Sequence, residues 1–304
     1  MSNKTEYSFN KEIQTKLIPF KTYLQELGNE SGTIRQKANY AGYFLKWMES
    51  GHITEATYND LLAFIGHCKE TGKSKKHINS MLRAVRNYYE HLKRSDEDLV
   101  NPAANLYLKG IKEKLPHDLL SFGALEEIFN AYPVIDARTK RNKVMLGLYI
   151  YQGVTTDELR KLQTGDINLQ QGKVRIPGSK RSNSRRLDLK PFQILDLHEY
   201  MNQIRPELIT EPTEQLFISM EGSRNIKNSV HHLFRALKRI NVGIKDARQV
   251  RSSVIVHWLN NHNLRKVQYM AGHKYVSSTE RYQMNNLEGL KTEVDKYHPL
   301  GNEV

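Results

Sequence analysis

Apolar residues recur at intervals of three and four along most of the first hundred residues, and this repeat restricts the fold more than any other feature. The repeat runs through residues 11–27, 31–48, 54–72 and 74–92. Such spacing places the apolar side chains on one face of an α-helix. Glycine separates the segments, and Ser or Thr residues that can cap the next helix follow. The chain is therefore predicted to begin with a module of four amphipathic helices.

The second half of the chain is also predicted to be mainly helical, with one short β-hairpin. Strand-like alternation is confined to residues 172–176 and 186–189, and a polar, basic turn formed by residues 177–185 joins them. The flanking segments repeat at helical spacing. The predicted fold is therefore mainly α with two domains, of which the second is a mixed α+β domain of helices and a small β-hairpin or sheet.

A charged segment bounded by glycine and proline, residues 110–117, separates the two halves. Such a composition is typical of an interdomain linker. We predict a helical N-terminal domain at residues 1–110, a linker at residues 111–117 and a C-terminal domain at residues 118–304. A length of 304 residues agrees with two domains of ordinary size.

The chain carries an excess of positive charge, because 46 Lys and Arg residues against 33 Asp and Glu give a formal net charge of +13. This charge favours a polyanionic partner, although a basic protein without a nucleic-acid role stays an alternative on charge alone. The single cysteine, Cys68, excludes an internal disulfide and a cysteine-rich metal site, which fits a reducing, cytoplasmic compartment. The sequence has no signal-peptide segment and no apolar run long enough for a bilayer, so no membrane association is expected.

The residues with the most chemical information lie between positions 247 and 282. This stretch contains an R-x-x-R pair, Arg248 and Arg251, then an apolar helix, a Gly-His pair ending at His273, and Tyr282 nine residues further on. These groups suit attack on a phosphodiester. Cations neutralise charge on the non-bridging oxygens, a histidine exchanges protons, and a tyrosine can be a covalent nucleophile. Each element alone is a weak signal, but the ordered set with this spacing is specific.

The ordered set resembles the C-terminal motif of the tyrosine recombinases, the phage integrase family. That family has His or Lys-x-x-Arg, then Leu-Gly-His, then a nucleophilic tyrosine at the spacing found in this chain. The resemblance implies a clamp of two domains around double-stranded DNA and strand cleavage through a 3′-phosphotyrosyl intermediate, with no cofactor and no metal. It also implies a homo-tetramer on DNA, with DNA-bending accessory proteins as further candidate partners.

The resemblance also assigns roles to the matching residues. The expected catalytic residues are Tyr282, Arg251, His273, Arg248 and Lys180. Tyr282 is expected to be the nucleophile, and Lys180 is expected to protonate the leaving 5′ oxygen. The other three are expected to hold the phosphate and its charge. Counting forward from the preceding motif reaches Ser179 instead of Lys180, so the register of the hairpin lysine stays open by one position.

One departure from the family pattern concerns its first arginine. The family motif G-L-R-x-x-E-L matches residues 153–159, with Thr155 in the place of the arginine. A threonine cannot replace a bidentate cation, and losing a transition-state donor typically costs a factor of about 10²–10³ in rate. Arg185 and Arg186 of the hairpin are candidates to supply the missing charge. The alternative interpretation is a catalytically degenerate DNA-binding protein of the same fold.

Two sets of basic residues are predicted to contact the DNA backbone, where Lys and Arg give affinity without sequence preference. They are Lys75, Lys76, Arg83 and Arg86 on the fourth helix, and Arg181, Arg185 and Arg186 in the hairpin. For the fourth helix, the alternative is an ordinary solvated helical face. For the hairpin, the alternative is that its basic residues, Lys180 included, form a loop that touches phosphates and has no catalytic role.

Two further functions stay open. One is a topoisomerase-like enzyme that nicks and closes DNA without exchanging partners. The other is an RNA-binding protein, which explains the charge but not the ordered motif. Residues 287–297 are predicted either to pack on a neighbouring protomer or to fold back on their own domain.

Overall fold

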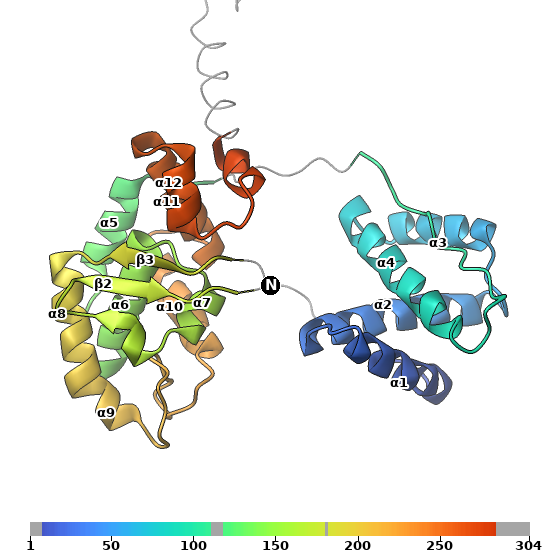
Figure 1. Cartoon of the computed structure of the whole chain (residues 1–304), viewed down its shortest axis with the longest axis horizontal. Coiled ribbons are helices and arrows are strands. Elements are labelled where there is room, and N and C mark those ends of the chain that lie inside the picture. Colours follow the sequence, from blue (N-terminus) through green and yellow to red (C-terminus); the bar gives the residue numbers. More distant parts are fainter. Residues whose placement is uncertain (1–7, 111–117, 180–181, 284–304) are drawn as a thin grey trace, which may run out of the picture. The chain divides into compact units, whose positions relative to one another are not determined.

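The computed structural model describes residues 8–110, 118–179 and 182–283 (Figure 1). The chain divides into two compact units, Met1–Glu113 and Lys114–Val304. Each unit has its own cluster of buried hydrophobic residues. The division lies within the predicted linker, while the predicted domain boundaries stay predictions. Lys180, Arg181 and the segment 287–297, for which the sequence predicts roles, lie outside the described residues.

The N-terminal unit contains the four helices that the apolar repeat predicts. They are α1 (Lys11–Glu26), α2 (Ser31–Ser50), α3 (Tyr58–Glu70) and α4 (Lys75–Leu92). The start of α3 was predicted four residues too early. Thr57 forms a capping box with Asp60, so the residues before Thr57 precede the helix.

Aromatic side chains from different helices fill the core of the N-terminal unit. Phe44 of α2 meets Phe64 of α3 edge-on, with ring centroids 5.1 Å apart, and Phe20 of α1 meets Tyr88 of α4 at 5.4 Å. Cys68 is fully buried among them, and burial raises the pKa of its thiol to about 11. Cys68 is therefore a core residue with an unreactive thiol.

The C-terminal unit is built around α6, which contacts α5, α8, α10 and α11. Its elements, in chain order, are α5 (Phe122–Ala131), α6 (Ala137–Tyr151), α7 (Thr156–Lys161), η1 (Thr164–Asp166), β1 (Ile167–Asn168), β2 (Lys173–Ile176), β3 (Arg185–Asp188), α8 (Pro191–Glu199), η2 (Tyr200–Ile204), α9 (Arg205–Leu208), α10 (Lys227–Ile240), α11 (Ala247–Asn261) and α12 (Leu264–Ala271). The strands form one antiparallel sheet in the order β1-β2-β3. The helix α12 lies beside β3 (Figure 1).

The strand β3 corrects the sequence-based prediction at one functionally important position. Arg185 was predicted to end a basic turn, but it is the first residue of β3 and pairs with Ile176 of β2. Alternate residues of a strand share a face, so Arg185 lies on the same buried face as Leu187. Only 2% of Arg185 is exposed. A charged side chain tolerates such burial only when it is paired, and the partner of Arg185 is described below.

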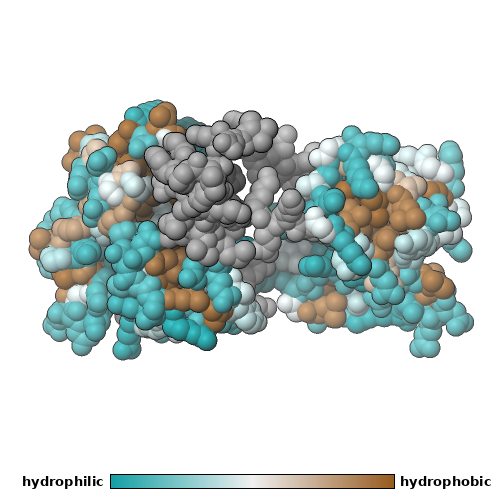
Figure 2. Space-filling view, turned by 90° about the horizontal axis from the view of Figure 1, so that it is seen from above, coloured by the Kyte–Doolittle hydropathy of each residue, from teal (hydrophilic) through white to brown (hydrophobic). Residues whose placement is uncertain are grey.

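Hydrophilic residues cover much of the surface of each unit in the view of Figure 2, and hydrophobic residues form separate patches between them. No helix in the described part of the chain is long and apolar enough to cross a membrane.

Candidate active site

The start of α7 holds a buried carboxylate at the centre of the candidate site. Thr155 is the N-cap of this helix. Its side chain accepts a hydrogen bond from the amide of Glu158 (3.1 Å), and Oε2 of Glu158 accepts one from the amide of Thr155 (2.8 Å). This capping box fixes the Glu158 side chain against the helix start, and only 4% of Glu158 is exposed. The threonine found in place of the family arginine thus has a defined local role.

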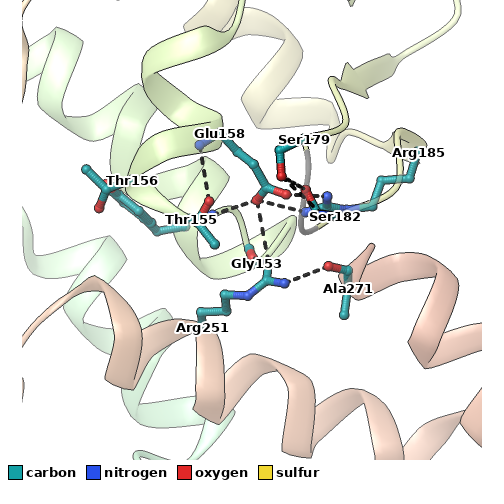
Figure 3. Close-up of polar contacts among 10 residues, drawn as sticks. Gly153, Thr155, Thr156, Glu158, Ser179, Ser182, Arg185, Arg251 and Ala271 are labelled. Carbon is teal, nitrogen blue, oxygen red and sulfur yellow. Dashed lines mark hydrogen bonds and ion pairs between the residues drawn. The ribbon is translucent and has the colours of Figure 1, made fainter. Parts of the chain in front are cut away.

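Two guanidinium groups from distant elements converge on the Glu158 carboxylate (Figure 3). Arg185 of β3 donates to both oxygens, with Nη1–Oε1 at 2.6 Å and Nη2–Oε2 at 3.1 Å. Arg251 of α11 lies with Nη1 3.6 Å from Oε2. Burial raises the pKa of Glu158, but the two arginines outweigh it and hold the pKa below its usual value. Glu158 is therefore ionised, and the cluster of one carboxylate and two guanidiniums keeps a net positive charge.

Arg251 also joins three segments of the unit. Its Nη1 donates to the carbonyl of Gly153, just before α7, and its Nη2 donates to the carbonyl of Ala271 at the end of α12 (2.6 Å) (Figure 3). Burial lowers the pKa of Arg251, and the Glu158 carboxylate opposes this effect. Arg251 therefore contacts both the segment before α7 and the residue that precedes the Gly-His pair.

The Gly-His pair touches the end of the β-hairpin. Gly272 ends α12 in the left-handed conformation, with φ at +68°. A Cβ at this position would lie 2.5 Å from Nη1 of Arg185 and 3.0 Å from the carbonyl oxygen of Asn183. The amide of Asn183 donates to the Gly272 carbonyl at 2.9 Å, and Ser182 forms a β-bridge with His273. Glycine is therefore required here by both backbone conformation and space.

His273 lies between a buried threonine and the predicted nucleophile. Its Nδ1 is 2.8 Å from Oγ1 of Thr279, and its ring stacks with that of Tyr282 at a centroid distance of 6.0 Å and an interplanar angle of 13°. Burial, followed by the charges of Arg251 and Arg185, lowers the pKa of His273 to about 4. The imidazole is therefore neutral at neutral pH and can accept a proton.

Thr279 and Glu158 complete the site but were not among the predicted site residues. Thr279 is fully buried. The feature of the sequence that could have pointed to it is its position between His273 and Tyr282. Glu158 was visible as the acidic residue of the G-x-x-x-x-E-L match, but no sequence pattern pointed to its arginine partners. Tyr282 itself is 9% exposed, within helical backbone that the structure describes from residue 277 to residue 283.

The remaining predicted residues fall into different environments. Arg248, at the start of α11, is exposed and makes no hydrogen bond or ion pair with the described residues. Arg186 is exposed on the face of β3 opposite Arg185. Of the predicted residues on α4, Lys75, Lys76 and Arg83 are exposed. Arg86 instead donates to the carbonyls of Ala103 (2.9 Å) and Leu106 (3.2 Å), so much of its donor capacity stabilises the N-terminal unit. DNA contacts of all these residues stay predictions.

No group of three or more His, Cys, Asp or Glu side chains within residues 8–110, 118–179 and 182–283 is arranged to hold a metal ion. The site described above consists of guanidinium, carboxylate, imidazole and phenol groups.

Acidification is expected to destabilise the wild type more steeply than a His273→Asn variant. Between about pH 6.5 and the folded pKa of about 4, the unfolded chain binds a proton at His273 that the folded chain does not. The free energy of unfolding therefore falls as the pH falls, by up to about 1.4 kcal/mol per pH unit from this group. Urea unfolding of both proteins across this range measures the difference. Parallel pH profiles would contradict the prediction.

Comparison with known families identifies the chain. Residues 119–288 match the model of the phage integrase family, and residues 16–96 match the model of the phage integrase N-terminal SAM-like domain. The chain belongs to the phage integrase family. The matched region of the first model includes every residue of the candidate site.

Curated members of the phage integrase family align over nearly the whole chain. Tyrosine recombinase XerA of Pyrococcus furiosus is 27% identical over 94% of this chain and 95% of its own length. Tyrosine recombinase XerD of Staphylococcus aureus is 25% identical over 94% of this chain and 99% of its own length.

Solved structures share the fold of this phage integrase family member. The XerH site-specific recombinase, bound to a palindromic difH substrate, superposes with a TM-score of 0.71 at 16% identity, covering 95% of this chain and 98% of XerH. The Tn1549 transposon integrase, in complex with a circular intermediate DNA, gives 0.64 at 14% identity, covering 91% and 99%. The predicted family and the predicted mainly helical fold are confirmed.

Proposed function

We propose that this phage integrase family member is a site-specific recombinase that cleaves and rejoins DNA through a 3′-phosphotyrosyl intermediate on Tyr282. The observation that carries the proposal is the meeting of four groups from separate elements. Arg185 of β3 and Arg251 of α11 flank one carboxylate, and His273 lies between these cations and the ring of Tyr282. These are the groups needed to activate a phenol and stabilise a pentavalent phosphate.

The cleavage step forms one bond and breaks one bond. The Tyr282 oxygen attacks the scissile phosphorus, and the bond to the 5′ oxygen breaks. His273, whose imidazole is neutral at neutral pH, accepts the phenolic proton. Lys180, the lysine expected from the family motif, donates a proton to the leaving 5′ oxygen. The 5′ hydroxyl of a second strand then attacks the phosphotyrosine, which restores the phenol and joins the new strands.

The arginines of α11 stabilise the negative charge on the phosphate in the transition state. Arg251 is held by Glu158 and by two carbonyls, so its guanidinium is oriented before the substrate arrives. Preorganised donors of this kind stabilise the transition state without a cost of reorientation. Arg248 is exposed one helical turn earlier and adds a second cation against the phosphate backbone.

Double-stranded DNA is the proposed partner, and four protomers assemble on two duplexes. The net charge of +13 supports a polyanionic partner. The XerH and Tn1549 structures contain DNA substrates, and a lambda integrase fragment was solved as a dimer bound to a core site. In the N-terminal unit, the exposed cations of α4 contact DNA phosphates; they are Lys75, Lys76 and Arg83. DNA-bending accessory proteins are further candidate partners.

Trapping of the covalent intermediate tests the proposal. The probe is a duplex that the protein itself selects from a random-sequence pool in repeated rounds of binding. Nicks are then placed at successive positions, so that a short fragment diffuses away after cleavage and leaves the protein attached. A protein–DNA band that resists detergent is expected at one nick position. Specific binding without such a band at any position would identify a degenerate DNA-binding protein.

A second assay separates recombination from topoisomerase-like activity. Two labelled duplexes that carry the selected site are incubated with the protein, and exchanged products are expected. Relaxation of a supercoiled plasmid without any exchange between duplexes would instead indicate an enzyme that only nicks and closes DNA.

A further inference from the structure

We infer that Arg185 replaces the arginine missing at position 155 and supplies a second guanidinium to the scissile phosphate. The inference rests on the proposed function, because it concerns the same cleavage step. It assigns a catalytic role to a residue that the sequence places in a basic turn and that the structure buries in a strand.

The first observation is that position 155 and Arg185 meet at the same carboxylate. The Glu158 side chain bonds the amide of Thr155 at 2.8 Å, and Arg185 reaches the same carboxylate from β3 at 2.6 and 3.1 Å (Figure 3). Thr155 is too short to place a cation there. Arg185 therefore brings a guanidinium from β3 to the Glu158 carboxylate, where the side chain of Thr155 provides no cation.

The second observation is that Arg185 adjoins the other groups of the site. A Cβ at Gly272 would lie 2.5 Å from its Nη1, so the guanidinium packs directly against the Gly-His pair. Burial, and then the positive charges of Arg251 and Arg185, lower the pKa of His273. Both arginines contact the same carboxylate, Glu158. Arg185 is thus close to Arg251 and His273, two of the groups to which the proposed function assigns a role in cleavage.

The third observation is an unpaired donor. Nε of Arg185 is buried and has no hydrogen-bond partner among the described residues, whereas Nη1 and Nη2 are paired with Glu158. A buried donor without an acceptor is destabilising, and such groups are rare unless they have a role. A non-bridging phosphate oxygen is the kind of acceptor that a guanidinium prefers. Because the Arg185 side chain is buried, neighbouring side chains must move when DNA binds.

The competing explanation is that Arg185 only neutralises Glu158 and never touches the phosphate. Both explanations predict that loss of Arg185 harms the enzyme, so loss of activity alone does not separate them. A direct contact predicts that the harm depends on the charge of the phosphate itself. A positioning role through Glu158 predicts the same harm whatever that charge is.

The experiment compares wild type, Arg185→Gln and Arg185→Lys on two versions of the nicked probe at saturating protein. One version has an ordinary scissile phosphate. The other has a methylphosphonate, in which an uncharged methyl group replaces one non-bridging oxygen. Arg235→Gln is the matched control, because it makes the same chemical change at an exposed arginine of α10, outside the site. The readout is the rate at which the covalent adduct forms.

Arg185→Gln is expected to slow adduct formation about 10²–10³-fold on the phosphate and much less on the methylphosphonate. Arg235→Gln is expected to change the rate at saturation little. Equal losses on both probes, or no loss on the phosphate, would overturn the inference. If Arg185→Gln does not fold, as judged by its unfolding curve and probe binding, Arg185→Lys carries the same comparison.

Restoring the arginine at its family position gives an independent test. Adding Thr155→Arg to Arg185→Gln is expected to recover at least about tenfold of the lost rate, since one bidentate donor is returned to the site. A double variant that folds but stays as slow as Arg185→Gln counts against the inference. Failure of the wild type to form any adduct would overturn the proposed function as well. An active wild type with an equally active Arg185→Gln variant overturns only the role of Arg185.

Discussion

Tyr282→Phe is expected to bind the selected duplex as the wild type does and to form no covalent adduct with it. The substitution removes one oxygen, and without it no bond to phosphorus can form. The ring, which is 9% exposed and stacks on His273, stays in place, so folding and binding are preserved. Gel-shift titration measures binding, and denaturing electrophoresis of the nicked probe measures the adduct.

The matched control for Tyr282→Phe is Tyr275→Phe, the same chemical change seven residues earlier. The Tyr275 side chain is 72% exposed. The chain has 16 tyrosines, so the control shows whether adduct formation requires the phenol at position 282 or tolerates the loss of any one phenol. Tyr275→Phe is expected to form the adduct at the wild-type rate. An adduct that persists in Tyr282→Phe would place the nucleophile elsewhere.

Glu158→Gln is expected to destabilise the C-terminal unit by about 3–5 kcal/mol, because removing one partner of a buried ion pair leaves the other charge uncompensated. In this case two guanidiniums lose their partner. The Arg185 side chain is 0% exposed and that of Arg251 is 11% exposed. Urea unfolding followed by the fluorescence of Trp258 measures the effect. A Trp47→Phe background removes the signal of the other tryptophan, which lies in the N-terminal unit.

Asp166→Asn is the matched control for Glu158→Gln, since Asp166 is also a buried carboxylate paired with an arginine. Its partner Arg175 has a side chain that is 55% exposed, so water can solvate the charge that is left. A loss of about 1 kcal/mol is expected from this change. Similar losses in both variants would show that pairing with buried arginines is not what makes Glu158 important.

Removing both charges separates the ion pair from the helix cap. Adding Arg185→Met to Glu158→Gln leaves no unpaired guanidinium from β3, so part of the lost stability is expected to return. If the double variant is less stable than Glu158→Gln, the contribution of Glu158 comes mainly from its capping contact with Thr155.

Features that depend on nearby residues could be predicted from the sequence. The helices α1 to α4 follow from apolar spacing and local capping, and all four are confirmed. The ordered set of Arg251, His273 and Tyr282 was sufficient to predict the family and a site-specific tyrosine recombinase, both of which the family match confirms. The roles of the individual site residues stay predictions.

Thr155 carries a local structural signal in addition to its place in the family motif. The sequence Thr155-x-x-Glu158 is a capping-box pattern, and the structure has the two reciprocal hydrogen bonds that the pattern implies. In the family motif, this threonine stands for a missing catalytic arginine, whereas in the helix it is the N-cap. Its position at the helix start is also what turns the Glu158 carboxylate toward the arginines.

The sequence by itself determined the helices, the likeness to the family and the order of the candidate catalytic groups, because each of these depends on spacing along the chain. Only the tertiary structure decided that Arg185 is buried and that it shares Glu158 with Arg251. Strand register assigned Arg185 to the inner face of β3, and the packing of α7, β3 and α11 brought together charges that are 27 and 93 residues from Glu158 in sequence. Pairing over such distances is set by how the elements pack, which no local pattern encodes.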